Sequence, residues 1–301
     1  MSIADPGARA APAKVTRPGG SDVLPRERLF ALLDDPRFQV VWISAPPGAG
    51  KTTLASSYLA QSGLPSLWYQ LDAGDEDPAT FFHYLDLAAR HAAPRQRKSL
   101  PALTAEYQAG LPVFARRFFE ALAAQLKTPA VLVLDNYQDV ATNAPLHAML
   151  REGLAALPEG VRTLVLSRTP PPPELSRLRA QQGLRLLGWD DLKLTVTEVD
   201  GIERLRHAAR RGSTPVSAQE LHGRTYGWAA GLVLLLEHDG RGSTHAPAGS
   251  GHQVLFDYFA DEIFLRLDAP VQKVLLAAAL LPKMRSATVA ALTDDATAEA
   301  L

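Results

Sequence analysis

Short apolar runs alternate with longer amphipathic stretches over the first two thirds of the chain. A short continuous apolar run predicts a buried strand, and apolar residues that recur every three or four positions predict a helix. Alternation of the two favours an α/β fold, a parallel sheet flanked by helices. The predicted strands lie at 39–44, 67–71, 131–134, 163–166 and 184–187. The predicted helices lie at 24–33, 51–61, 79–90, 113–126, 144–157 and 174–181.

The pattern changes near residue 195, where strand signals stop. The helices predicted beyond this point lie at 198–211, 218–222, 228–237, 253–267 and 270–280. GRGSTHAPAGSG at 240–251 has the Gly, Ser and Pro content of a flexible linker. We therefore expect a disordered lead-in at 1–20, an α/β domain at 21–194, a helical domain at 195–240, a linker at 241–251 and a further domain at 252–301. Because the chain ends at TDDATAEAL without a terminal motif, we expect a piece of a longer protein.

The segment QVVWISAPPGAGKTTL at 39–54 has the order of a phosphate-binding loop: an apolar strand, a glycine-rich turn and Lys-Thr-Thr at the start of a helix. Gly48 and Gly50 lack a Cβ, so the backbone can approach phosphate oxygens closely. Ala45 stands where the strict motif has its leading glycine. The residues expected to bind the phosphates are Pro47, Gly48, Ala49, Gly50, Lys51, Thr52 and Thr53. The loop predicts binding of a nucleoside triphosphate.

A second motif, VLVLDNYQDV at 131–140, is an apolar strand that ends in Asp135, the form of a Walker B strand. Carboxyl ends of parallel strands meet at one edge, so Asp135 and the hydroxyl of Thr52 are expected to hold Mg²⁺. Many NTPases place a second carboxylate next, but here that position is Asn136, which cannot be a general base. Its amide can still orient a water, so Asn136 predicts slow hydrolysis. Lys51, expected on the β- and γ-phosphates, is a further catalytic candidate.

Three further polar residues follow predicted strands. Arg168 ends the strand TLVLSR and is expected to contact the γ-phosphate as a sensor. Asp72 ends the second strand and is a weaker catalytic candidate. Asp77, followed by Pro78, is expected to cap a helix instead.

Composition narrows the remaining possibilities. The 301 residues include 47% hydrophobic and 21% charged residues, which is ordinary for a globular protein. The formal net charge of −1 provides no general attraction to nucleic acid or anionic membranes, and the absence of cysteine excludes disulfides and thiolate metal sites. The histidines do not cluster, so Mg²⁺ is the one metal expected. Without a signal core or a membrane-length apolar run, we expect a cytoplasmic location.

Several motifs together resemble the ATPase module of MalT-type regulators, which are STAND-class signal-transduction ATPases that often end in a LuxR-type DNA-binding domain. The resemblance covers about 22–300. The most specific segments are LDAGDEDPATFFHYL and RTYGWAAGLVLL; the others are LPRERLFALL, SAPPGAGKTTL, LVLDNYQDV, LVLSRTPP, DLKLT, DYFADEIFLRL and VQKVLLAAALL.

The resemblance implies a P-loop nucleotide-binding domain, a small helical domain and a winged-helix domain, the last truncated at 252–301. It implies that Gly227 and Trp228 belong to an element that touches the nucleotide, although Ala229 replaces the proline of that element. Arg26, in LPRERLFALL, joins the expected nucleotide-binding residues. The preference for ATP or ADP, an ADP-bound resting form and self-association with ATP and an inducer are also implied. Inducer and DNA would bind through domains beyond residue 301.

Three other functions remain open. An AAA+-like ATPase would turn over actively in a ring, which Asn136 disfavours. A small-molecule kinase would need an acceptor site, for which we see no signature. Direct DNA binding by 252–301 is disfavoured because DYFADEIFLRLDAP is acidic.

Overall fold

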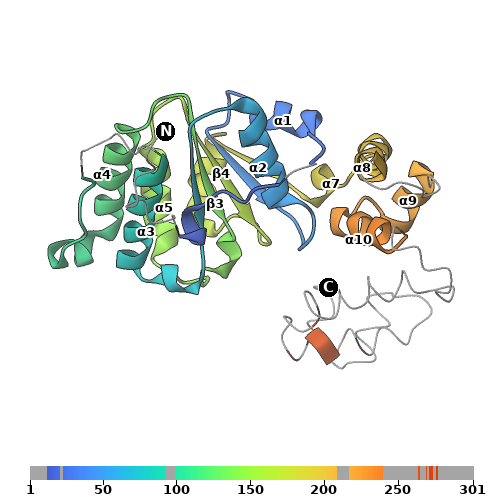
Figure 1. Ribbon diagram of the computed structural model, residues 1–301. Coiled ribbons are helices and arrows are strands. Elements are labelled where there is room, and N and C mark those ends of the chain that lie inside the picture. Colours follow the sequence, from blue (N-terminus) through green and yellow to red (C-terminus); the bar gives the residue numbers. More distant parts are fainter. Residues whose placement is uncertain are drawn as a thin grey trace, which may run out of the picture. The chain divides into compact units, whose positions relative to one another are not determined.

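Figure 1 shows the computed structural model of the chain. The structure describes residues 12–20, 23–92, 99–208 and 217–239, with a few further positions between 264 and 276. The chain divides into two compact units, one of residues 1–209 and 215–230 and the other of 210–214 and 231–301. The residues expected to form the site all belong to the first unit.

The first unit is built on a five-stranded sheet in the order β2-β3-β4-β1-β5, with every neighbouring pair parallel. The strands are β1 (Val40–Ser44), β2 (Ser66–Gln70), β3 (Ala130–Asp135), β4 (Val161–Ser167) and β5 (Leu184–Leu187). The prediction of a parallel sheet flanked by helices is confirmed, and each predicted strand overlaps an observed one.

Helices cover both faces of the sheet (Figure 1). α3 (Pro78–Ala92), α4 (Leu111–Ala123) and α5 (Leu146–Ala155) lie on one face, and α1 (Glu27–Leu33) and α2 (Lys51–Ser62) lie on the other. Strand β1 shows the consequence: Trp42 joins the core under α3 to α5, whereas Ile43 joins the core under α2. Because successive side chains point to opposite faces and both faces are buried, β1 and β3 are apolar up to their last residue.

The remaining elements are shorter or follow the sheet. The other α-helices are α6 (Ser176–Ala180), α7 (Trp189–Leu192), α8 (Val196–Ala208), α9 (Ala218–Thr225) and α10 (Ala229–Asp239). The 3-10 helices are η1 (Ala13–Val15), η2 (Ala73–Glu76), η3 (Ala105–Gly110), η4 (Tyr137–Asp139) and η5 (Pro173–Leu175). The expected linker at 241–251 and winged-helix domain at 252–301 lie outside the continuously described residues. Within the described part, no helix is both long enough and apolar enough to cross a membrane.

The expectation of a disordered lead-in over 1–20 is wrong for residues 12–20. η1 packs at the edge of the sheet beside β2, and Val15 is only 2% exposed within the core. The side chains of Val15 and Lys14 anchor this segment. Contacts made by only two side chains cannot be recognised from a composition rich in Ala, Pro and Gly.

Helices α4 and α5 cross so closely that Gly153 cannot carry a side chain. A Cβ at Gly153 would lie 2.6 Å from Cδ2 of Phe119, which is itself fully buried. We expect Gly153→Ala to lower the free energy of unfolding in urea by about 1–3 kcal/mol, the usual cost of overpacking a core. The matched control is Gly223→Ala in α9, where a Cβ meets nothing within 4 Å. That change should stabilise by about 0.5–1 kcal/mol because alanine is the better helix former. Equal effects of the two substitutions would contradict the close crossing.

Candidate functional site

Strand β1 leads into a tight loop, residues 45–50, at the carboxyl edge of the sheet. Gly48 and Gly50 have φ values of +70° and +86°, a region that side chains other than glycine rarely adopt, and Gly50 is the N-cap of α2. Ala45, by contrast, is absent from the positive-φ residues of the described chain and donates its N–H to the carbonyl of Ser167 at 3.2 Å. The backbone at this position therefore does not require the glycine of the strict motif.

Lys51 begins α2 and turns its side chain back over the loop. Its Nζ donates to the carbonyl oxygens of Ala45 at 2.6 Å and Pro46 at 3.0 Å. Burial lowers the pKa of Lys51 to about 8, assisted by the positive charge of Arg168 and opposed by Asp135. Two neighbouring cations in a desolvated position favour an anionic ligand, because a negative charge would relieve their repulsion.

Thr52 and Asp135, the pair expected to hold Mg²⁺, lie together. Thr52 Oγ1 donates to the Asp135 carboxylate, 3.0 Å from Oδ2 and 3.3 Å from Oδ1. Asp135 is 3% exposed at the end of β3. Burial raises the Asp135 pKa, while hydrogen bonds from Thr52 and from the backbone N–H of Asn136 act in the opposite direction. A carboxylate and a hydroxyl at this spacing are suitable oxygen ligands for Mg²⁺.

Asn136 and Arg168 follow β3 and β4 at the same edge. Asn136 adopts a left-handed conformation with φ +59°, and its N–H donates to Oδ1 of Asp135 at 2.9 Å. This turn orients the carboxylate. The backbone N–H of Arg168 donates to Oε1 of Gln138 at 3.0 Å, which ties the turn after β4 to the one after β3. Because β4 lies between β1 and β3, the positive charge of Arg168 reaches Lys51.

The other acidic candidates have structural partners. Asp72 Oδ1 accepts from the N–H of Gly74 at 2.9 Å and so caps η2, while its other oxygen pairs with Lys14. Asp77 accepts from the N–H of Thr80 at 3.0 Å and caps α3, in agreement with the sequence analysis. Neither carboxylate contacts the loop.

Arg26 is buried, and its guanidinium forms hydrogen bonds within the chain. Its guanidinium donates to Glu198 at 3.1 Å and to the carbonyl of Leu192 at 2.7 Å. A contact between Arg26 and a nucleotide stays a prediction. Arg28 binds the same carboxylate of Glu198 at 3.0 Å, so two arginines before and within α1 hold the start of α8. The sequence analysis missed this cluster, since nothing local to Glu198 indicates partners 170 residues away.

Residues 227–230, here called the Trp228 segment, contact the loop directly. Trp228 Nε1 donates to the carbonyl of Pro47 at 3.0 Å, and the N–H of Ala230 donates to the carbonyl of Gly48 at 2.9 Å. Gly227 is needed for this approach, because it has φ +77° and a Cβ there would lie 2.7 Å from the carbonyl oxygen of Leu194. The structure thus brings Gly227 and Trp228 to the loop across more than 170 residues.

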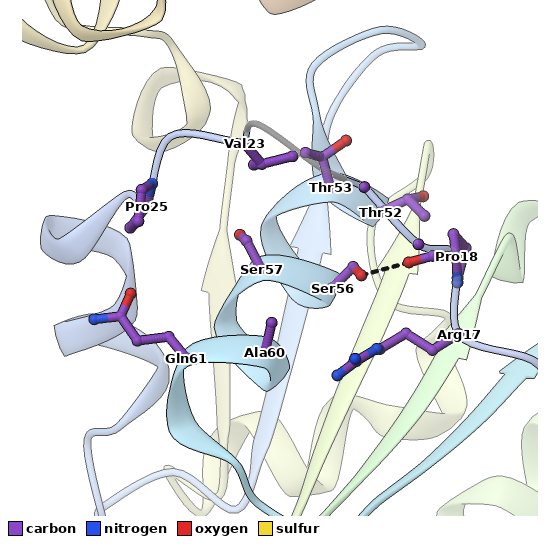
Figure 2. A pocket seen from close by; sticks show the side chains of 12 residues that line it. Arg17, Pro18, Val23, Pro25, Thr52, Thr53, Ser56, Ser57, Ala60 and Gln61 are labelled. Atoms are coloured by element: carbon purple, nitrogen blue, oxygen red, sulfur yellow. Dashed lines mark hydrogen bonds between the residues drawn. The ribbon is translucent and has the colours of Figure 1, made fainter. Parts of the chain in front are cut away.

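A cavity of about 440 Å³ adjoins the loop along the outer side of α2 (Figure 2). Residues 17–20, Val23 and Pro25 line one side, and α2 residues from Thr52 to Gln61 line the other. The sequence analysis missed the contribution of 17–20, because it treated that segment as lead-in. The cavity reaches the first turn of α2, because Thr52 and Thr53 are among the residues that line it.

The family model described as Nephrocystin 3, N-terminal, matches residues 20–168. The HTH-type transcriptional regulator MalT of Cronobacter sakazakii is 32% identical to this chain over 295 residues, which are 94% of this chain and 32% of MalT. Among solved structures, a Signal Transduction ATPase with Numerous Domains (STAND) protein with a tetratricopeptide repeat sensor, from Pyrococcus horikoshii, matches with a TM-score of 0.50 at 16% identity. It covers 93% of this chain and 38% of that one. This structural likeness supports the fold, and the chain spans about a third of the relative's length.

The contact between the loop and the Trp228 segment can be tested at two glycines that share a positive φ. A Cβ at Gly48 would lie 2.6 Å from Cβ of Ala230 and 2.8 Å from Nε1 of Trp228, whereas a Cβ at Gly50 meets only Ala229, at 3.7 Å. Both alanine variants carry similar backbone strain, so their difference isolates the contact. We expect Gly48→Ala to be less stable than Gly50→Ala by about 1–3 kcal/mol in urea unfolding without ligand. Variants of equal stability would mean that the segment does not press on the loop.

Proposed function

This chain is a homologue of MalT-type transcriptional regulators, and on that premise we propose that it is an ATP- or ADP-binding regulatory switch module of a bacterial regulator. The resemblance indicated by the sequence motifs is confirmed by this relationship. The observation that carries the proposal is the Thr52–Asp135 hydrogen bond beside a loop into which Lys51 is turned. This arrangement offers backbone N–H groups, a cation and oxygen ligands for a metal where the first turn of α2 meets the end of β3.

The chemistry of each group assigns its role. The backbone N–H groups of 48–53 and the ammonium of Lys51 would bind phosphate oxygens; Pro47 has no N–H to offer. Thr52 and Asp135 would hold Mg²⁺, which supplies neutralisation of the phosphate charge. The cavity between α2 and residues 17–20, Val23 and Pro25 has room for the nucleoside, next to the first turn of α2. The choice of adenine rests on the relationship to MalT.

We propose slow hydrolysis. Asn136 stands beside Asp135 and offers an amide, which orients a water but does not take its proton. Arg168, whose charge already acts on Lys51, is suited to sense the γ-phosphate from the end of β4. Slow hydrolysis would leave a bound triphosphate intact for longer, which suits a switch better than a motor.

The switch would act through the Trp228 segment. Its bonds to the carbonyls of Pro47 and Gly48 couple the loop's backbone to the start of α10. ADP would favour a closed arrangement of the domains. ATP together with an inducer would shift the population toward an open arrangement that self-associates. Inducer and DNA would bind to parts of the protein outside this chain. We propose a cytoplasmic location for such a regulator.

The proposal is tested by acid-denaturing the purified chain and identifying any nucleotide released. We expect near-stoichiometric ADP or ATP. In Lys51→Ala, affinity should fall at least about tenfold, because a charge-assisted hydrogen bond is worth about 1.5–3 kcal/mol. Lys127→Ala removes an exposed lysine and should bind normally. If neither the purified chain nor a direct titration shows ATP or ADP binding, the proposal fails.

Slow hydrolysis is tested at Asn136. We expect Asn136→Asp to raise turnover about tenfold or more, because it adds a carboxylate that can accept a proton from water. Asn143→Asp makes the same change at an exposed position and should leave turnover unchanged. Steady-state phosphate release measures both variants. Turnover of the unmodified chain at several per second would contradict the proposal.

A further inference from the structure

The segment of residues 12–20, here called the strap, is fixed at one end by Lys14. Lys14 Nζ lies 2.7 Å from Oδ2 of Asp72 and 3.0 Å from Oδ2 of Asp75. The same ammonium lies 4.6 Å from the ring centre of Tyr84 and 5.6 Å from that of Tyr69. Two carboxylates and two aromatic faces therefore surround one cation, and Val15 beside it is buried in the core.

This anchor is stronger than a surface ion pair. The side chain of Lys14 is 14% exposed and that of Asp75 is fully buried. Asp75 also accepts from the hydroxyl of Tyr69 and, at 2.8 Å, from the N–H of Asp72, so its position is fixed independently of Lys14. Burial by itself would lower the Lys14 pKa, but hydrogen bonds and charges of Asp72 and Asp75 outweigh it and raise the pKa. Lys14 is thus charged at neutral pH.

The other end of the strap reaches α2. Ser56 Oγ donates to the carbonyl of Pro18 at 2.6 Å, as Figure 2 shows. Around the Pro18 attachment, residues 17–20 line the cavity together with Thr52 and Thr53, which belong to the first turn of α2 and to the expected phosphate-binding residues. A segment that was expected to be disordered is therefore one wall of this cavity.

We propose that Lys14 is a positioning residue for nucleotide binding: its ion pairs hold the strap as a wall of the cavity and so slow nucleotide release. The inference rests on the proposed function, because it takes the cavity to be the nucleoside's place. Lys14 itself belongs to the cluster at the carboxyl end of β2 and acts through the backbone of 15–20. Release of the nucleotide is then faster when the strap is free to move away from the cavity.

The test compares release of radiolabelled ADP, chased with excess unlabelled ADP, from the unmodified chain and Lys14→Met. Methionine keeps the apolar stem and removes the charge, so we expect release to be about tenfold faster, corresponding to about 1.4 kcal/mol. Lys14→Arg keeps the charge, and its release rate should return to within about threefold of the unmodified chain. Lys127→Met, at an exposed lysine, should release ADP at the unmodified rate.

A second variant tests the same ion pairs in case Lys14→Met does not fold. Asp72→Asn keeps the oxygen that caps η2 and removes one of the two charges facing Lys14, so it should accelerate release by a smaller factor. Hydrogen exchange provides a separate readout. ADP should slow exchange of the N–H groups in the strap of the unmodified chain, and this protection should be lost in Lys14→Met.

Each outcome separates the two proposals. Unchanged release from Lys14→Met and Asp72→Asn, together with lost binding in Lys51→Ala, overturns the role of Lys14 and leaves the proposed function intact. Faster release in Lys14→Met that Lys14→Arg does not restore also overturns it, since the charge is then not the cause. Absence of ADP binding to the unmodified chain overturns both.

Discussion

Parallel pairing of β1 with β4 and of β4 with β3 places three strand ends at one edge of the sheet. The loop at 45–50, Asp135 and Arg168 each follow one of these strands, so their proximity is a consequence of backbone pairing. The register keeps both faces apolar and buried, which leaves the edge as the place where polar groups can gather. The Thr52–Asp135 hydrogen bond and the low pKa of Lys51 both follow from this arrangement.

Two segments distant from the loop in sequence complete the site. The strap and the start of α1 run along one side, from the Lys14 cluster past the cavity to Arg26, which binds Glu198 at the start of α8. The Trp228 segment contacts the loop on its backbone carbonyls. Arg26, Arg28 and Glu198 connect the chain before the phosphate loop to the helices after the sheet.

Much of the fold was predictable because its signals are local. The five strands are short, mostly apolar runs, and the loop, Asp135 and the cap at Asp77 each follow from a few adjacent residues. The long-range partners of Arg26 and Lys14 were not predictable. Lys14 sits in a segment rich in Ala, Pro and Gly, and the carboxylates that hold it are nearly 60 residues away. The expectation of disorder at 12–20 failed because a few contacts attach that segment, those of Val15 and Lys14 and the Ser56–Pro18 hydrogen bond, and composition averages over them.

The sequence by itself determined the α/β class, the glycine-rich loop after β1, the carboxylate that ends β3 and the relationship to MalT-type regulators, because each resides in a contiguous motif. Only the tertiary structure decided that Ala45 is tolerated, that Asp72 pairs with Lys14, that Arg26 is bound to Glu198 and that Trp228 donates to Pro47. These contacts join residues far apart in sequence. Their partners are selected by how the strands pair and how the chain packs around them, which no local pattern of residues records.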